Sequence, residues 1–110
     1  MHTFPCENGD EFPKNQYTKW FDYDKIKGTL SLRHRQPGDY LTLPSGGRKT
    51  LKSWMIDEKI PRQEREEIWL LAEEKHILWI VGHRISAYYK ITEQTKTILE
   101  VEFNGGKSSG

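Results

Sequence analysis

The longest apolar run in the sequence, Ile77–Val81, is only five residues long. A helix that crosses a bilayer needs about 20 apolar residues, so the sequence predicts no membrane span. A second apolar run, Trp69–Ala72, comes just before it, and Glu73-Glu74-Lys75 lies between the two as a turn. Short runs that are apolar on both faces are typical of strands buried between layers. The two runs therefore predict two buried strands joined by a tight turn.

The chain has 110 residues and one cysteine, Cys6. A single cysteine can form neither an internal disulfide nor a thiolate zinc cluster, so the fold has to rest on a hydrophobic core. One domain of this length can bury about 60–70% of the surface that its unfolded chain exposes. No apolar segment follows a basic N-terminus, as a secretory signal would require. We therefore expect a cytoplasmic protein.

Both ends of the sequence lack a periodic pattern. Residues 1–16 contain two prolines and an Asn-Gly pair, which predicts an irregular lead-in or a linker remnant. Residues 105–110, Gly-Gly-Lys-Ser-Ser-Gly, predict a flexible tail. We expect one folded unit over residues 17–104.

Within that unit, extended segments surround a helical middle. The sequence predicts further strands over residues 20–24, 29–35, 40–43 and 97–103. In the last of these, apolar side chains alternate with Glu100 and Glu102, so the glutamates face outward. In the second, Leu30, Leu32 and His34 share one face.

Residues 50–59 show helical spacing, with Leu51, Trp54 and Met55 on one stripe and Thr50 as N-cap. Pro61 ends this segment and begins a second helical turn over residues 62–67. The order of elements predicts an α+β fold: a small mixed or antiparallel sheet with a helix-turn-helix-like middle segment packed on it. We expect Trp54 to lie in the core, although a base-stacking role is the alternative.

The net charge is only +1, but residues 33–62 hold seven Lys/Arg against three Asp/Glu. A basic segment in a near-neutral chain is either a footprint for phosphate or solvated helix and turn charge. Arg33 and Arg35 favour the phosphate footprint, because alternate strand residues lie about 7 Å apart, close to the spacing of successive phosphates. The alternative is that the two arginines pair with Glu100 and Glu102 across a sheet.

The motifs of catalysis and metal binding are not met. Ser45–Thr50 lacks the Gly-Lys pair of a Walker A loop, and Lys49 stands where a Ser-Gly-Gly-x-Asp-Ser loop needs aspartate. The four histidines show no metal-ligand spacing, and no serine sits in a nucleophile elbow. We therefore predict no catalytic residue, no metal site and no cofactor for this chain.

Three segments carry a family resemblance. They are Leu32-Arg-His-Arg-Gln-Pro-Gly-Asp39, Arg48-Lys-Thr-Leu-Lys-Ser-Trp-Met-Ile-Asp-Glu-Lys-Ile-Pro-Arg62 and Trp79-Ile-Val-Gly-His-Arg-Ile85. In this order they closely resemble the C-terminal domain of bacterial tRNA(Ile)-lysidine synthase. Thr50 departs from the family, which often has lysine there, and the turn between Asp39 and Ser45 is short.

The resemblance implies a tRNA-binding accessory domain of an enzyme that uses ATP to join lysine to the wobble cytidine of tRNA(Ile). ATP and lysine belong to a catalytic domain that this sequence does not contain. The implied partners are the acceptor stem or body of tRNA(Ile), the parent catalytic domain and a second copy of the chain. The alternative is a protein-protein or interdomain docking module without RNA affinity of its own.

The basic segment and the family resemblance indicate the same set of residues. The predicted RNA contacts are Arg33, Arg35, Arg48, Lys49, Lys52, Arg62 and Arg84. Turns and supports are predicted at Gly38, Asp39, Asp57 and Gly82, where the glycines meet backbone requirements and the aspartates pair with the cations.

Overall fold

The computed structural model describes residues 2–6 and 17–103. The chain divides into two compact units, where the sequence had suggested one. Unit 1 combines Met1–Ile26 with Tyr89–Gly110, and unit 2 is the continuous segment Lys27–Tyr88. The predicted tail at 105–110, and residues 7–16 of the predicted lead-in, lie outside the described residues.

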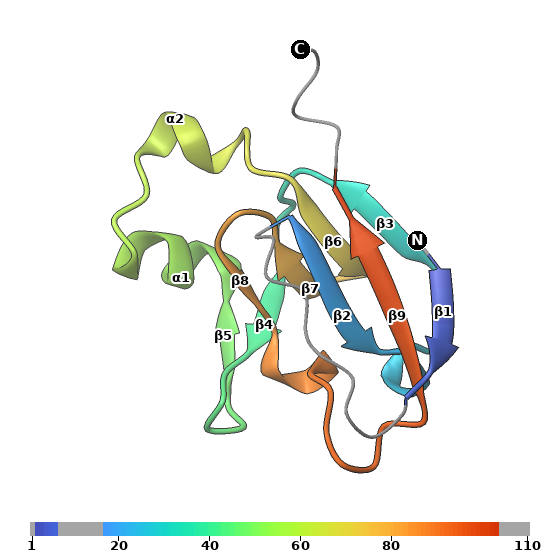
Figure 1. The fold of residues 1–110 in the computed structure, drawn as a ribbon. Helices are drawn as coiled ribbons and strands as arrows, with labels where there is room; N and C mark the ends of the chain where they lie inside the picture. Colours follow the sequence, from blue (N-terminus) through green and yellow to red (C-terminus); the bar gives the residue numbers. More distant parts are fainter. Residues whose placement is uncertain (1, 7–16, 104–110) are drawn as a thin grey trace. The chain divides into compact units, whose positions relative to one another are not determined.

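Unit 1 is built on a three-stranded antiparallel sheet in the order β1-β9-β2 (Figure 1). The strands are β1 (His2–Pro5), β2 (Thr18–Asp22) and β9 (Thr97–Glu102), and a 3-10 turn, η1 (Tyr23–Lys25), follows β2. Ile98, Leu99 and Val101 of β9 are buried, and Glu102 is exposed, as the alternation predicted for the glutamate.

The irregular lead-in predicted for residues 1–16 is wrong at residues 2–5, which form β1. This strand pairs with β9 in the register His2↔Glu100 to Pro5↔Thr97. The Phe4 ring meets the Trp20 ring edge-on at a centroid distance of 5.1 Å. Pro5 is tolerated because it ends an edge strand, where its missing N–H breaks no central ladder.

Unit 2 contains a mixed sheet in the order β3-β6-β7-β4-β5, with β8 added beside β7. The strands are β3 (Leu30–Arg33), β4 (Tyr40–Thr42), β5 (Arg48–Thr50), β6 (Leu70–Glu73), β7 (His76–Ile80) and β8 (Arg84–Ile85). The β4–β7 pair is parallel and the other pairs are antiparallel. The predicted pair of apolar strands is confirmed as β6 and β7, joined by a turn in which Glu74 has a φ of 56°.

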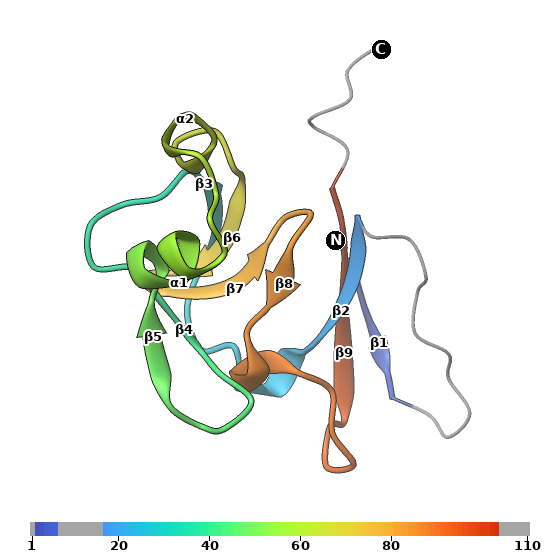
Figure 2. The ribbon, with the colours of Figure 1, turned by 90° about the vertical axis from the view of Figure 1, so that its left-hand side faces the viewer.

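Helix α1 (Leu51–Asp57) begins where the sequence predicted, because the Thr50 side chain accepts a hydrogen bond from Ser53 N at 3.2 Å. Helix α2 (Arg62–Arg65) follows Pro61, and η2 (Ala87–Tyr89) follows β8. Figure 2 shows α1 beside β4 and β5. The α+β class with a mixed sheet is therefore confirmed.

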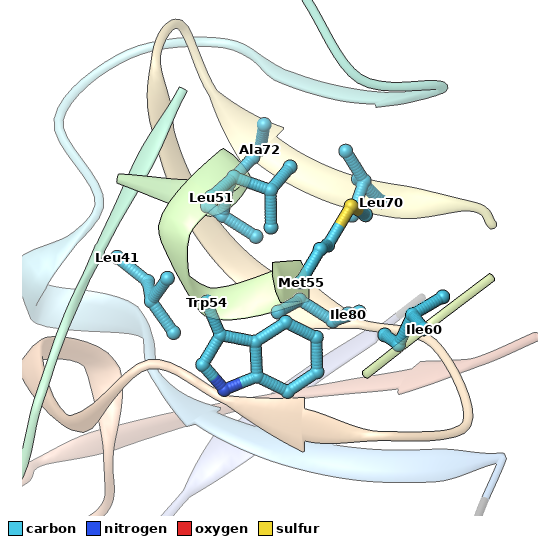
Figure 3. Packing of buried hydrophobic residues seen from close by; sticks show 9 residues of the cluster. Leu41, Leu51, Trp54, Met55, Ile60, Leu70, Ala72 and Ile80 are labelled. Atoms are coloured by element: carbon cyan, nitrogen blue, oxygen red, sulfur yellow. The ribbon is translucent and has the colours of Figure 1, made fainter. Parts of the chain in front are cut away.

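The core of unit 2 lies between α1 and one face of the sheet (Figure 3). Trp54, predicted as a core residue, is 4% exposed, and Met55 is fully buried. The cluster consists of Leu41, Leu51, Trp54, Met55, Ile60, Leu70, Ala72, Ile77 and Ile80. No helix among the described residues is long and apolar enough to cross a membrane.

The bounds of two predicted strands differ in the structure, and two further strands were not predicted. β2 begins two residues before the predicted Trp20, and β3 is shorter than the predicted 29–35, ending at Arg33. Strands β5 and β8, of three and two residues, were not predicted, because segments this short carry no visible alternation. Leu32 of β3, the edge strand of this sheet, is 49% exposed.

Candidate functional site

The turn between β3 and β4 is held by a buried aspartate. Asp39 is 3% exposed, and its Oδ2 accepts a hydrogen bond from Gln36 N at 2.8 Å. The backbone closes the same turn through Asp39 N and Gln36 O, 3.3 Å apart. Gly38 has a φ of +89°, a left-handed conformation that other residues adopt only with strain. The Pro-Gly-Asp turn thus has the residue chemistry that its backbone needs.

Arg33 is fixed to this turn by a bidentate ion pair. Its Nη1 and Nη2 donate to Asp39 Oδ2 and Oδ1, each at 2.9 Å. Nη1 also donates to His34 O and Nη2 to Glu74 O. The Arg33 side chain is only 16% exposed. The fork of the guanidinium is therefore occupied within the protein.

Arg35 lies beyond the end of β3, so the two arginines do not share one strand face, contrary to the prediction from their spacing. Arg35 Nη2 and Nε donate to Glu66 Oε2 at 2.6 and 2.9 Å. The carboxylates that pair with the two arginines are thus Asp39 and Glu66. The predicted alternative partners, Glu100 and Glu102, are wrong. Since the Glu66 side chain is 63% exposed, this second pair is at the surface.

A pocket of about 570 Å³ opens beside this turn. Its walls come from the 35–39 turn, the start of α1 and the residue that follows α2. The lining residues are Arg35, Gln36, Pro37, Gly38, Asp39, Thr50, Leu51, Lys52 and Glu66. Among the predicted RNA contacts, the pocket thus brings Arg35 and Lys52 together, with Asp39 and Glu66 as acidic neighbours.

The other predicted cations differ in how they are held. Lys49 pairs with Asp57 of α1, and Arg48 lies over the Tyr40 ring with its guanidinium carbon 4.6 Å from the centroid. Lys52, Arg62 and Arg84 have no ion-pair partner among residues 2–6 and 17–103. Gly82, predicted as a backbone requirement, has a φ of +84° between β7 and β8.

A stacked column of side chains next to β5 was missed by the sequence analysis. His76 stacks on Tyr40 at 4.6 Å between centroids and meets Tyr88 at 5.1 Å. Its Nε2 lies 3.0 Å from Thr42 Oγ1. Burial, and then the Arg48 charge, lower the pKa of His76. The parallel β4–β7 pairing creates this column, and no local pattern signals it.

Within the described part of the chain, no group of three or more His, Cys, Asp or Glu is placed to hold a metal ion. Ser86, whose hydroxyl also lies beside the column, is 1% exposed and accepts hydrogen bonds from Thr42 N and Tyr88 N. This serine therefore has a structural role. The groups that this site offers to a ligand are Lys and Arg side chains and aromatic rings.

The family model for the TilS substrate C-terminal domain matches residues 30–102. The chain belongs to this family. The match covers all three segments on which the resemblance rested, and it also contains every predicted RNA-contact and turn residue. Recognition from sequence is therefore confirmed.

Two curated relatives show how much of a longer protein this family domain represents. The tRNA(Ile)-lysidine synthase of Caldanaerobacter subterraneus subsp. tengcongensis is 46% identical over 95 residues, which is 86% of this chain and 20% of the relative. That of Clostridium tetani is 41% identical over 101 residues, 91% of this chain and 22% of the relative. The chain thus spans about a fifth of the length of the relatives it matches. It corresponds to their accessory domain and not to their catalytic part.

The fold agrees with a solved structure described as the crystal structure of a TILS C-terminal domain. The TM-score is 0.63 at 26% identity, and the match covers 93% of this chain and 82% of the other.

Proposed function

We propose that the chain binds the tRNA substrate of a tRNA(Ile)-lysidine synthase, with unit 2 as the surface that contacts RNA phosphates. One observation carries the proposal. All seven predicted contact residues fall in Lys27–Tyr88, where eleven Lys/Arg face eight Asp/Glu, while the remaining sequence holds six against eight. Cations that neutralise phosphates release counterions, which gives RNA binding its affinity and its salt dependence.

The contacts within unit 2 rank six of the seven residues. Lys52, Arg62 and Arg84 form no ion pair among the described residues, so none has to break when they contact a phosphate. Arg35 and Lys49 would exchange exposed carboxylates for phosphates, a small cost because exposed pairs contribute about 0–1 kcal/mol. Arg33 is held by buried Asp39, so its contribution to binding is indirect: it fixes the turn that carries Arg35.

The rest of the parent protein would supply the chemistry. By this proposal, ATP and lysine are bound outside this chain, the chain itself needs no cofactor or metal, and the protein works in the cytoplasm where tRNA is modified. The RNA partner is tRNA(Ile), contacted at the acceptor stem or body. Recognition of a stem would follow the shape and phosphates of A-form RNA more than its bases.

The test is binding to tRNA(Ile) across a salt titration, with a duplex DNA of equal length for comparison. We expect a tRNA preference and a steep loss of affinity with salt. Lys52→Gln and Arg62→Gln should each weaken binding and reduce the slope of log K against log salt by about 1. Lys96→Gln, an exposed lysine of unit 1, is the matched control. Equal affinity for all three variants and the unchanged protein would refute the proposed surface.

A docking role is the second candidate, because Leu32 and Ile56 of unit 2 are each 49% exposed. Such side chains fit an interface with the parent catalytic domain or with a second copy of the chain. Docking predicts a solution mass that rises with protein concentration and is lower for the Leu32→Ser variant. Together with an absence of tRNA binding at low salt, this result would favour docking over RNA recognition.

A further inference from the structure

The column next to β5 continues beyond its three rings to a charged end. In order, the Arg48 guanidinium lies over Tyr40, Tyr40 stacks on His76 with 25° between planes, and His76 meets Tyr88. Arg48 is exposed and lies on β5, the edge strand of its sheet. The column therefore ends at the surface in a flat cation.

Hydrogen bonds hold the middle of the column in place. His76 Nε2 is 3.0 Å from Thr42 Oγ1 and 3.5 Å from Ser86 Oγ. Ser86 Oγ in turn accepts from Thr42 N at 3.1 Å. The imidazole is thus fixed from β4 and from the segment after β8, so it supports the Tyr40 ring on which Arg48 lies.

Arg48 differs from Arg33, Arg35 and Lys49 because it lies over a ring, whereas they pair with carboxylates. A guanidinium that rests on an aromatic face keeps its N–H groups in the plane of the stack, where they can bond a phosphate. Planar guanidinium and aromatic groups are the platforms on which proteins stack unpaired RNA bases. Paired bases inside a duplex cannot reach such a platform.

We propose that the Arg48 end of this column binds an unpaired RNA nucleotide, with the base stacked on the guanidinium that Tyr40 supports. This inference rests on the proposed RNA-binding function and adds a ligand class to it: a single-stranded nucleotide, bound in addition to phosphates along a stem. The burial that lowers the pKa of His76 favours a neutral imidazole, so the positive charge of the column is concentrated at Arg48.

The experiment compares two RNA probes: a single-stranded heptamer of adenosine and a blunt-ended RNA hairpin closed by a stable tetraloop. Arg48→Lys keeps the charge and removes the plane, and Tyr40→Leu removes the supporting ring. Each change should weaken binding of the heptamer by about 5- to 100-fold, the range for loss of one stacked base. Binding of the hairpin should change less than twofold.

Two controls keep the result specific. Tyr40→Phe retains the ring and should bind the heptamer like the unchanged protein, which separates stacking from misfolding. Tyr23→Leu removes an exposed tyrosine of unit 1 and should change neither probe. In the unchanged protein, NMR signals of the His76 ring should shift when the heptamer is added.

Hairpin binding without heptamer binding would overturn the nucleotide site and leave the proposed function standing. Equal heptamer affinity for Arg48→Lys and the unchanged protein would overturn it as well. If neither probe binds at low salt, the RNA-binding function fails together with the site.

Discussion

Each of the two units contains a buried aspartate that organises a turn, but different groups satisfy the two carboxylates. In unit 2, Asp39 binds the Arg33 guanidinium through both oxygens. In unit 1, Asp22 is equally buried, at 3% exposure, and accepts from Asp24 N and from Thr95 Oγ1, each at 3.0 Å. One carboxylate is balanced by a full charge, and the other by neutral donors.

The difference separates structural charge from charge available to a ligand. In unit 2, the ion pair with Asp39 holds Arg33 within the fold. The other Lys and Arg side chains still outnumber the other Asp and Glu side chains and are available to bind phosphate. Unit 1 carries six Lys/Arg and eight Asp/Glu in its sequence, so it offers no comparable excess. A basic count alone would have treated Arg33 and Lys52 as equivalent, whereas burial shows that they are not.

The largest effect should come from Asp39→Ala. It leaves the Arg33 guanidinium, 16% exposed, without its carboxylate, and breaking a buried pair in this way costs about 3–5 kcal/mol. Urea denaturation followed by tryptophan fluorescence measures the loss. The double change Arg33→Met with Asp39→Ala should be less destabilising than Asp39→Ala alone, because no buried charge is left unpaired. A double variant that is less stable than the single one would show that another contact of Asp39 dominates.

Asp22→Ala should cost less, about 1–3 kcal/mol, because it leaves neutral donors unsatisfied. Thr95→Val removes the hydroxyl that donates to the same carboxylate, so the two changes should be less than additive in urea denaturation. If Asp22→Ala proves as costly as Asp39→Ala, the contrast between charged and neutral partners does not explain the two turns.

The sequence predicted those parts of unit 2 that are specified locally. Thr50 caps α1, Pro61 precedes α2, and Gly38 permits the turn, each through chemistry confined to a few neighbouring residues. The motifs around these residues also identified the family, because they carry the turns and caps that this fold requires.

Long-range pairing accounts for what the sequence did not predict. β1 pairs with a strand that begins at Thr97, so no local pattern distinguished residues 2–5 from a linker. The Tyr40–His76 stack depends on the parallel pairing of β4 with β7 in the same way. Predicted partners failed for the same reason: Arg35 finds Glu66, on the segment after α2, and not a glutamate on a neighbouring strand.

A third, smaller effect concerns pH. Burial and Arg48 lower the pKa of His76 in the folded protein, so the unfolded chain binds a proton more readily. Stability is therefore greatest with His76 neutral, above the ordinary histidine pKa of 6.5, and falls as the pH drops from there towards the lowered folded pKa. Thermal denaturation at a series of pH values should show this loss, and His76→Gln should remove it. His83→Gln, a change outside the column, is the control; if it removes the loss instead, the assignment to His76 is wrong.

The smallest change in stability should follow Glu66→Gln, and it tests the availability of Arg35 directly. The pair is exposed, so its loss should alter the free energy of unfolding by less than about 1 kcal/mol. The same change leaves the Arg35 guanidinium beside the pocket with a neutral neighbour, so tRNA affinity should rise and the salt slope steepen. An unchanged slope would mean that Arg35 does not reach a phosphate. Because stability and affinity are expected to move separately here but together in Asp39→Ala, the two variants distinguish a surface cation from one that belongs to the fold.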